Sequence, residues 1–170
     1  MSNPILDFPP LSRVRRNHGL EHATIHILSK KYPNVHMGGM STPRGFTIFG
    51  DVPTEEVAEA AIEALKSLRA GQASLAMHAN CGTNFAVSGM MAGAAAWLGT
   101  LGAGKQFKQK LERLPLMVLL ATVALILTRP LGPIIQKRVT TSGDPEGLEL
   151  ERVETIVRAG VRMHRVLTKG

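Results

Sequence analysis

The chain has 170 residues, enough for one domain of ordinary size or for a small soluble domain joined to a membrane element. Its one cysteine excludes an internal disulfide, and residues 1–10 lack the basic and apolar regions of a secretory signal. The net charge of +7 is compatible with binding to nucleic acid or to anionic lipid. Because the basic residues lie beside apolar segments and do not alternate with aromatic residues, we expect a lipid bilayer and no nucleic acid as partner.

The first part of the chain predicts helices and short strands in one small domain. Ser12 and Thr54 are suitable helix caps, Pro33 stops the first helix, and Gly71 follows the apolar stripe of the second. The expected elements are a helix over residues 12–31, strands over 35–37 and 46–49, a helix over 54–70 and a strand over 73–77.

Two apolar segments follow. Residues 85–104 carry no charge, and residues 114–128 are strongly apolar, with a basic loop between them. We expect an inserted transmembrane helical hairpin, and the alternative is a hairpin buried in a globular core. Gly89 and Gly93 have the spacing of small residues that lets two helices approach closely, which predicts a homo-oligomer through this face.

After the hairpin the pattern changes to alternation around residues 148–153 and 161–167. We expect a C-terminal β-hairpin that returns to the soluble domain's sheet, with a helix over 148–158 as the alternative. The predicted fold class is therefore α+β with an inserted transmembrane hairpin. The domain boundaries are 1–83, 84–135 and 136–170. Localisation at the cell membrane is expected, with the soluble domain in the cytoplasm because no signal would export it.

The first helix carries the sequence His18-Gly19-Leu20-Glu21-His22, an H-x-x-E-H pattern. Imidazoles one helical turn apart can bind one zinc ion, and a glutamate beside them can accept a proton from metal-bound water. Glu21 is thus a candidate general base. The alternative is a polar helix face whose histidines form hydrogen bonds with neighbours or lipid headgroups.

A second group, His78 and Cys81, precedes the first apolar segment. An imidazole and a thiolate are ligands that zinc or another divalent transition metal accepts, so His18, His22, His78 and Cys81 are the candidate metal ligands. All four together would form a closed structural site, whereas three would leave a catalytic position open. Alternatives of lower rank are Glu55, Glu56 and Glu59, with His26 in reserve; His36 and His164 are not expected to bind metal.

Three blocks together resemble the bacterial YqhQ-like family of membrane proteins, described as predicted metal-dependent enzymes. They are His18-Gly19-x-Glu21-His22, His78-x-x-Cys81-Gly82-Thr83-x-Phe85, and Gln136-x-x-x-Thr140-Thr141-x-x-x-Pro145. The resemblance implies a membrane-embedded protein with a metal site built from the first two blocks. This chain departs from the pattern because it lacks an apolar segment before His18, has Ala79-Asn80 between His78 and Cys81, and is short.

The function expected from these patterns is that of a membrane-associated, metal-dependent hydrolase. A peptidase that cleaves protein or peptide is the specific activity considered. The alternative is a non-enzymatic membrane protein in which the same residues form a structural metal site or a polar docking network.

Overall fold

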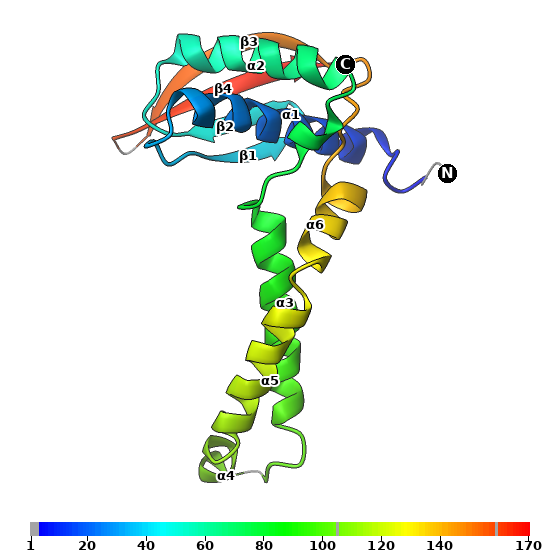
Figure 1. The fold of residues 1–170 in the computed structure, drawn as a ribbon, viewed down its shortest axis with the longest axis vertical. Helices are drawn as coiled ribbons and strands as arrows, with labels where there is room; N and C mark the ends of the chain where they lie inside the picture. The colour runs from blue at the N-terminus through cyan, green and yellow to red at the C-terminus, as the bar shows by residue number, and fades with distance from the viewer. Residues whose placement is uncertain (1–3, 105, 159) are drawn as a thin grey trace. The chain divides into compact units, whose positions relative to one another are not determined.

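The computed structural model describes residues 4–104, 106–158 and 160–170 (Figure 1). The chain divides into two compact units, of which the first contains Met1–His78 and Lys137–Gly170 and the second contains Ala79–Gln136. The first unit is therefore built from two stretches of chain that the second unit interrupts.

The first unit contains a four-stranded, fully antiparallel sheet in the order β1-β2-β4-β3. Its strands are β1 (Gly38–Thr42), β2 (Gly45–Phe49), β3 (Glu149–Arg158) and β4 (Val161–Lys169). The expected C-terminal hairpin is confirmed, and β4 pairs with both β2 and β3. The strand expected at residues 35–37 is wrong, and the strand begins instead at Gly38. An edge strand such as β1 accepts two consecutive glycines.

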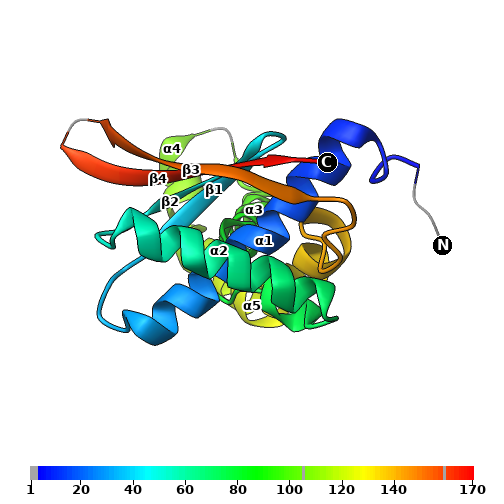
Figure 2. The same ribbon diagram turned by 90° about the horizontal axis from the view of Figure 1, so that it is seen from above.

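Two helices cover one face of this sheet, α1 (Pro9–Lys31) and α2 (Thr54–Arg69) (Figures 1 and 2). Both expected helices are confirmed. The first begins earlier than expected, because two prolines occupy its first turn, where a helix needs no backbone N–H donor. The core lies between the helices and the sheet, and its largest fully buried apolar side chains are those of Leu20, Leu28, Phe46, Ile48, Val52, Val57, Leu148 and Val166.

The strand expected at residues 73–77 is wrong. After Gly71, whose φ of +86° turns the chain, residues Ala73–Ala76 form the short 3-10 helix η1. Backbone carbonyls at the end of this segment form hydrogen bonds with histidine side chains of α1, instead of a strand ladder. This pairing could not be read from local alternation.

The second unit is helical. Its elements are α3 (Gly82–Gly99), α4 (Phe107–Leu111), α5 (Leu114–Leu127) and α6 (Leu131–Ile135), followed at the boundary by the π-helix η2 (Gln136–Thr140). The helices α3 and α5 approach each other closely at Gly99 and Met117. A Cβ on this glycine would lie only 3.1 Å from the Met117 Cα. At Gly89 and Gly93 the same test finds no neighbour within 4 Å, so this face of α3 is open.

The expected transmembrane hairpin is wrong. Among the described residues, no single helix is both long enough and apolar enough to cross a membrane. Within the part of the chain that the structure describes, only the combination of Phe107–Leu127 and Leu131–Thr140, bent by 51°, meets the requirements of length and composition. The helix α3 ends at Gly99, before the charge-free segment does, and α5 ends at Leu127. The fold of the first unit is α+β with an open four-stranded sheet.

Candidate metal centre

The helix α1 presents His18, His22 and His26 one turn apart along one side, and His78 follows η1 beside them. The ring centroids of His18 and His22 are 4.4 Å apart. The His78 ring lies 5.7 Å from that of His22 and 4.9 Å from that of His26. The first unit therefore gathers four imidazoles into one cluster, although His78 is far from the others in sequence.

Backbone carbonyls fix the orientation of the first two rings. Nδ1 of His18 lies 2.9 Å from the Thr140 carbonyl oxygen, and Nδ1 of His22 lies 2.8 Å from that of Ala76. Because a carbonyl oxygen only accepts, Nδ1 carries a proton in both rings, and the neutral form of each ring offers Nε2 as the metal-binding nitrogen. A bond of this kind from the second nitrogen is typical of histidines that bind metal ions.

His26 has the opposite arrangement. Its Nε2 forms the bond to a backbone carbonyl, that of Met77, at 2.7 Å. The Nε2 of His26, the reserve candidate, is thus occupied by a carbonyl, whereas Nε2 is the nitrogen that His18 and His22 would offer to a metal ion.

The ligand atoms of His18, His22 and Cys81 lie within 4.8 Å of one another, so these residues form a cluster that could bind a metal ion. His22 and Cys81 are 3% and 5% exposed. Cys81 is the residue that precedes the first turn of α3 and follows His78 by three positions. Of the four expected ligands, three form this cluster, and His78 lies against His22 without being one of its members.

Glu21 is buried, at 3% exposure, on the side of α1 that faces β1. The Ser41 hydroxyl donates a hydrogen bond to its Oε2 at 2.5 Å. Gly39 makes room for the carboxylate, because a Cβ there would lie 2.4 Å from Oε1. Ser41 and Gly39 were missed from sequence, and the only signal was a pair of glycines next to a strand.

Gly19 explains how the second stretch of the first unit, which begins at Lys137, packs against α1. A Cβ on Gly19 would lie 2.0 Å from the Ser142 carbonyl oxygen and 3.2 Å from the Ala76 Cβ. The Ser142 N–H also donates to the Arg15 carbonyl at 2.9 Å. Only glycine permits this approach, which places Thr140 where its carbonyl can accept from His18.

The lower-ranked candidates have other surroundings. Glu56 forms an ion pair with Lys31 at the C-terminal end of α1, and this bond raises the pKa of Lys31. His36 is exposed on the loop after α1. His164 is fully buried in β4 with Nδ1 3.0 Å from the Thr54 hydroxyl, and burial lowers its pKa. Neither histidine belongs to the cluster of His18, His22 and Cys81.

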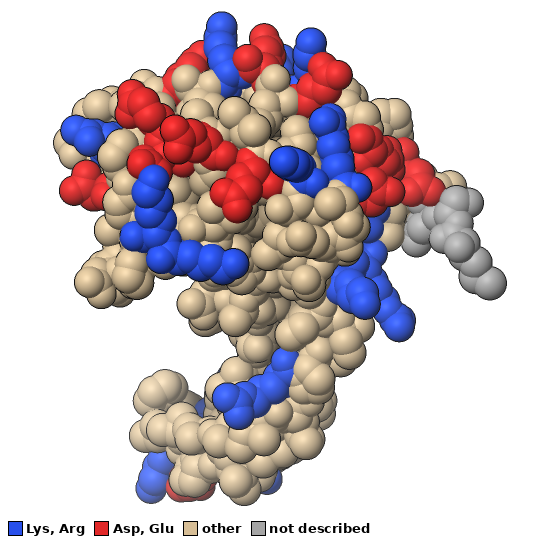
Figure 3. All heavy atoms as spheres, turned by 45° about the horizontal axis from the view of Figure 1, so that its top comes forward, with Lys and Arg blue, Asp and Glu red and all other residues tan. Residues whose placement is uncertain are grey.

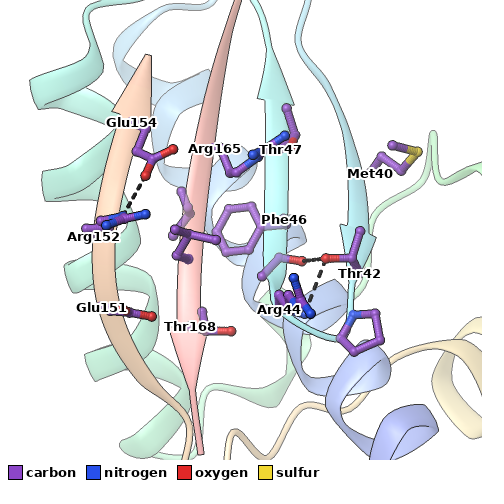
Figure 4. A pocket seen from close by; sticks show the side chains of 14 residues that line it. Met40, Thr42, Arg44, Phe46, Thr47, Glu151, Arg152, Glu154, Arg165 and Thr168 are labelled. Carbon is purple, nitrogen blue, oxygen red and sulfur yellow. Dashed lines mark hydrogen bonds and ion pairs between the residues drawn. The ribbon is translucent and has the colours of Figure 1, made fainter. Parts of the chain in front are cut away.

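The uncovered face of the sheet has a pocket of about 690 Å³ (Figure 4). Arg152 and Glu154 form an ion pair across part of it, at 2.5 Å. None of the candidate metal ligands lines this pocket. The cluster on α1 is therefore the site where the sequence pattern and the structure coincide.

Comparison with known proteins gives a family and no activity. The family DUF6391, a domain of unknown function, matches residues 13–153. An uncharacterised protein of the cyanobacterium Picosynechococcus sp. is 34% identical over 166 residues, covering 88% of this chain and 77% of that protein. No solved structure matches the chain significantly. These matches do not test the resemblance to the YqhQ-like family, which stays a prediction. The chain belongs to the DUF6391 family.

Proposed function

We propose that the protein is a zinc-dependent hydrolase acting on peptide or protein, with His18, His22 and Cys81 as metal ligands. The observation that carries the proposal is the pair of Nδ1–H bonds from His18 and His22 to backbone carbonyls. These bonds leave Nε2 of each neutral ring available as ligand, and a ligand atom of each histidine lies in one cluster with the buried Cys81 thiol. Two imidazoles and a thiolate match the ligand preference of zinc.

The chemistry follows from the number of ligands. Zinc prefers four ligands, so His18, His22 and Cys81 would leave one position on the ion open, and the ion would supply activation of water near neutral pH. In this proposal Glu21 is the general base that receives the proton, and its hydrogen bond from Ser41 holds the carboxylate in one orientation. His78 lies beside His22 and is the reserve fourth ligand.

The metal is tested by elemental analysis of the purified full-length protein. We expect about one zinc ion per chain in the wild type and in a His36→Ala control, whose histidine is exposed. His22→Ala and Cys81→Ser should each lose most of the metal, because a two-ligand site binds weakly. Wild-type protein without stoichiometric metal after growth in zinc-supplemented medium would refute the proposal.

A structural metal site is the second candidate, and the burial of His22 and Cys81 favours it. Glu21→Gln separates the two functions. A hydrolase should keep its zinc and lose cleavage of a peptide library followed by mass spectrometry. A structural site should keep its zinc while chelation lowers the melting temperature, with no cleavage by the wild type in the same assay.

We further propose that lipid covers the apolar surface of the second unit, which would place the protein at the cell membrane. No residue of α5 is buried, and all its leucines, valines and isoleucines except Leu120 are exposed. Charged side chains are sparse on this unit in Figure 3. The basic residues Lys108, Lys110 and Arg113 precede α5, and Arg129 follows it, which suits anionic headgroups.

Vesicle flotation tests the lipid contact. The purified protein should float with vesicles of phosphatidylglycerol and phosphatidylcholine, and Leu119→Glu combined with Val123→Glu in α5 should reduce the floating fraction. Detergent-free protein that stays monodisperse and does not float would contradict lipid contact. A stable dimer that does not float would assign this surface to a second copy instead.

A further inference from the structure

A second pocket, of about 480 Å³, lies in the first unit, and none of the candidate metal ligands lines it. It is formed by the N-terminal half of α1, the end of α2, and the segment that follows the inserted helices. Its polar and charged lining residues are Arg15, Arg69, Lys137, Thr141, Ser142 and Asp144.

The pocket is electropositive. Three cationic side chains, those of Arg15, Arg69 and Lys137, come from three separate segments and meet a single carboxylate, that of Asp144. Within the described part of the chain, none of the three cations forms an ion pair. Three cations around one hollow without a carboxylate partner repel one another, so an anion in the pocket would lower the electrostatic energy.

Arg15 gives an independent indication. Its Nη2 donates to the carbonyls of Arg138 and Thr141, at 3.4 and 3.3 Å, which holds the side chain in place. Its Nε is buried, and among the described residues it has no hydrogen-bond acceptor. A buried guanidinium donor without an acceptor costs free energy, and a ligand oxygen could remove this cost.

The loop on the other side of the pocket is fixed before any ligand binds. The Ser142 N–H donates to the Arg15 carbonyl at 2.9 Å. Gly143 packs against Ala73 so closely that a Cβ on the glycine would lie 2.6 Å from the Ala73 Cβ. The Ser142 hydroxyl donates to the Asp144 carbonyl at 2.8 Å, which closes the turn. A pre-formed cradle loses little conformational entropy on binding.

We infer that this pocket binds a phosphate group, either of a free phosphorylated compound or of a phospholipid headgroup. Guanidinium and ammonium groups are the usual partners of phosphate, and a doubly charged anion matches the excess of two positive charges over Asp144. Lys137 is the first residue of the first unit after the inserted helices. The site does not depend on a metal ion, so it can be tested apart from the proposed hydrolase.

The test uses the full-length protein in micelles of a neutral detergent and isothermal titration calorimetry. The probes are inorganic phosphate, glycerol 3-phosphate, and phosphatidic acid in mixed micelles with phosphatidylcholine alone as the blank. Lys137→Gln is the main variant because its side chain is exposed and makes no hydrogen bond within the described residues. Lys66→Gln removes the same charge from an exposed site of α2 outside the pocket and is the matched control.

The expected result is phosphate-dependent binding that falls about tenfold in Lys137→Gln and changes less than about twofold in Lys66→Gln. Binding of both soluble probes identifies a free phosphorylated ligand, and binding of phosphatidic acid alone identifies a headgroup. No binding of any probe by the wild type, or equal losses in the two variants, would overturn the inference. Arg15→Gln provides a second variant, with its circular dichroism melting curve compared with wild type to confirm folding.

Discussion

Single glycines determine how close the segments around the candidate metal centre can come. Gly19 lets the Ser142 carbonyl meet the backbone of α1, and Gly39 lets the Glu21 carboxylate lie beneath β1. Neither glycine is needed for the local secondary structure, since both lie inside regular elements. Because glycine has no side chain, each position permits the close approach of another segment.

Gly39→Ala should therefore lower the free energy of unfolding by about 1–3 kcal/mol, because the new methyl group overlaps the buried carboxylate of Glu21. Gly38→Ala is the matched control, because a Cβ there meets nothing within 4 Å. Urea unfolding followed by circular dichroism measures both. Equal stability of the two variants would show that Glu21 can move aside at little cost.

His164 predicts a dependence of stability on pH. Burial is the largest cause that lowers its pKa below the ordinary 6.5, and the charge of Arg162 acts in the same direction. The Gly50 carbonyl and the carboxylates of Glu55 and Asp51 oppose the shift, and the Thr54 hydroxyl contacts Nδ1. At pH values below about 6.5 the unfolded chain therefore binds a proton that the folded chain does not, so stability falls as the pH decreases.

The measurement compares urea unfolding at pH 7.5 and pH 5.5. His164→Gln should lose part of the difference between the two pH values, whereas His36→Gln, at an exposed position, should keep it. If both variants show the wild-type difference, another group causes the acid sensitivity.

At the scale of elements, cap and stop residues predicted α1, the amphipathic period predicted α2, and alternation favoured the hairpin of β3 and β4 over a helix. The segment η1 was missed because its carbonyls are paired with His22 and His26, and such long-range contacts leave no local pattern. The apolar composition of residues 85–104 suggested one spanning helix, but α3 stops at Gly99. For the site, the H-x-x-E-H pattern and the later cysteine identified the clustered residues, whereas Gly39, Ser41 and Thr140 depend on tertiary packing.

Self-association through Gly89 and Gly93 stays a prediction at this scale. The open surface at both positions is the geometry that a close helix–helix contact needs.

For the whole molecule, the division into two units predicts that the first can fold without most of the second. Every residue of the buried apolar core belongs to the first unit. Replacing residues 85–134 by a flexible Gly-Ser linker keeps this core and all the candidate metal ligands. We expect a cooperative thermal transition by circular dichroism and bound zinc. A variant without a cooperative transition would mean that the inserted helices are needed to complete the fold.

The sheet order has a consequence for the time at which this protein matures. β4 lies between β2 and β3, yet it is the last strand to be synthesised. A nascent chain on the ribosome therefore carries α1 and its histidines before the strand that joins the two halves of the sheet has been synthesised. The Thr140 carbonyl that orients His18 also emerges late. The proposed metal site can therefore form only after the segment that contains Thr140 has been synthesised, and a truncation that removes residues 137–170 should leave the histidines without a formed site.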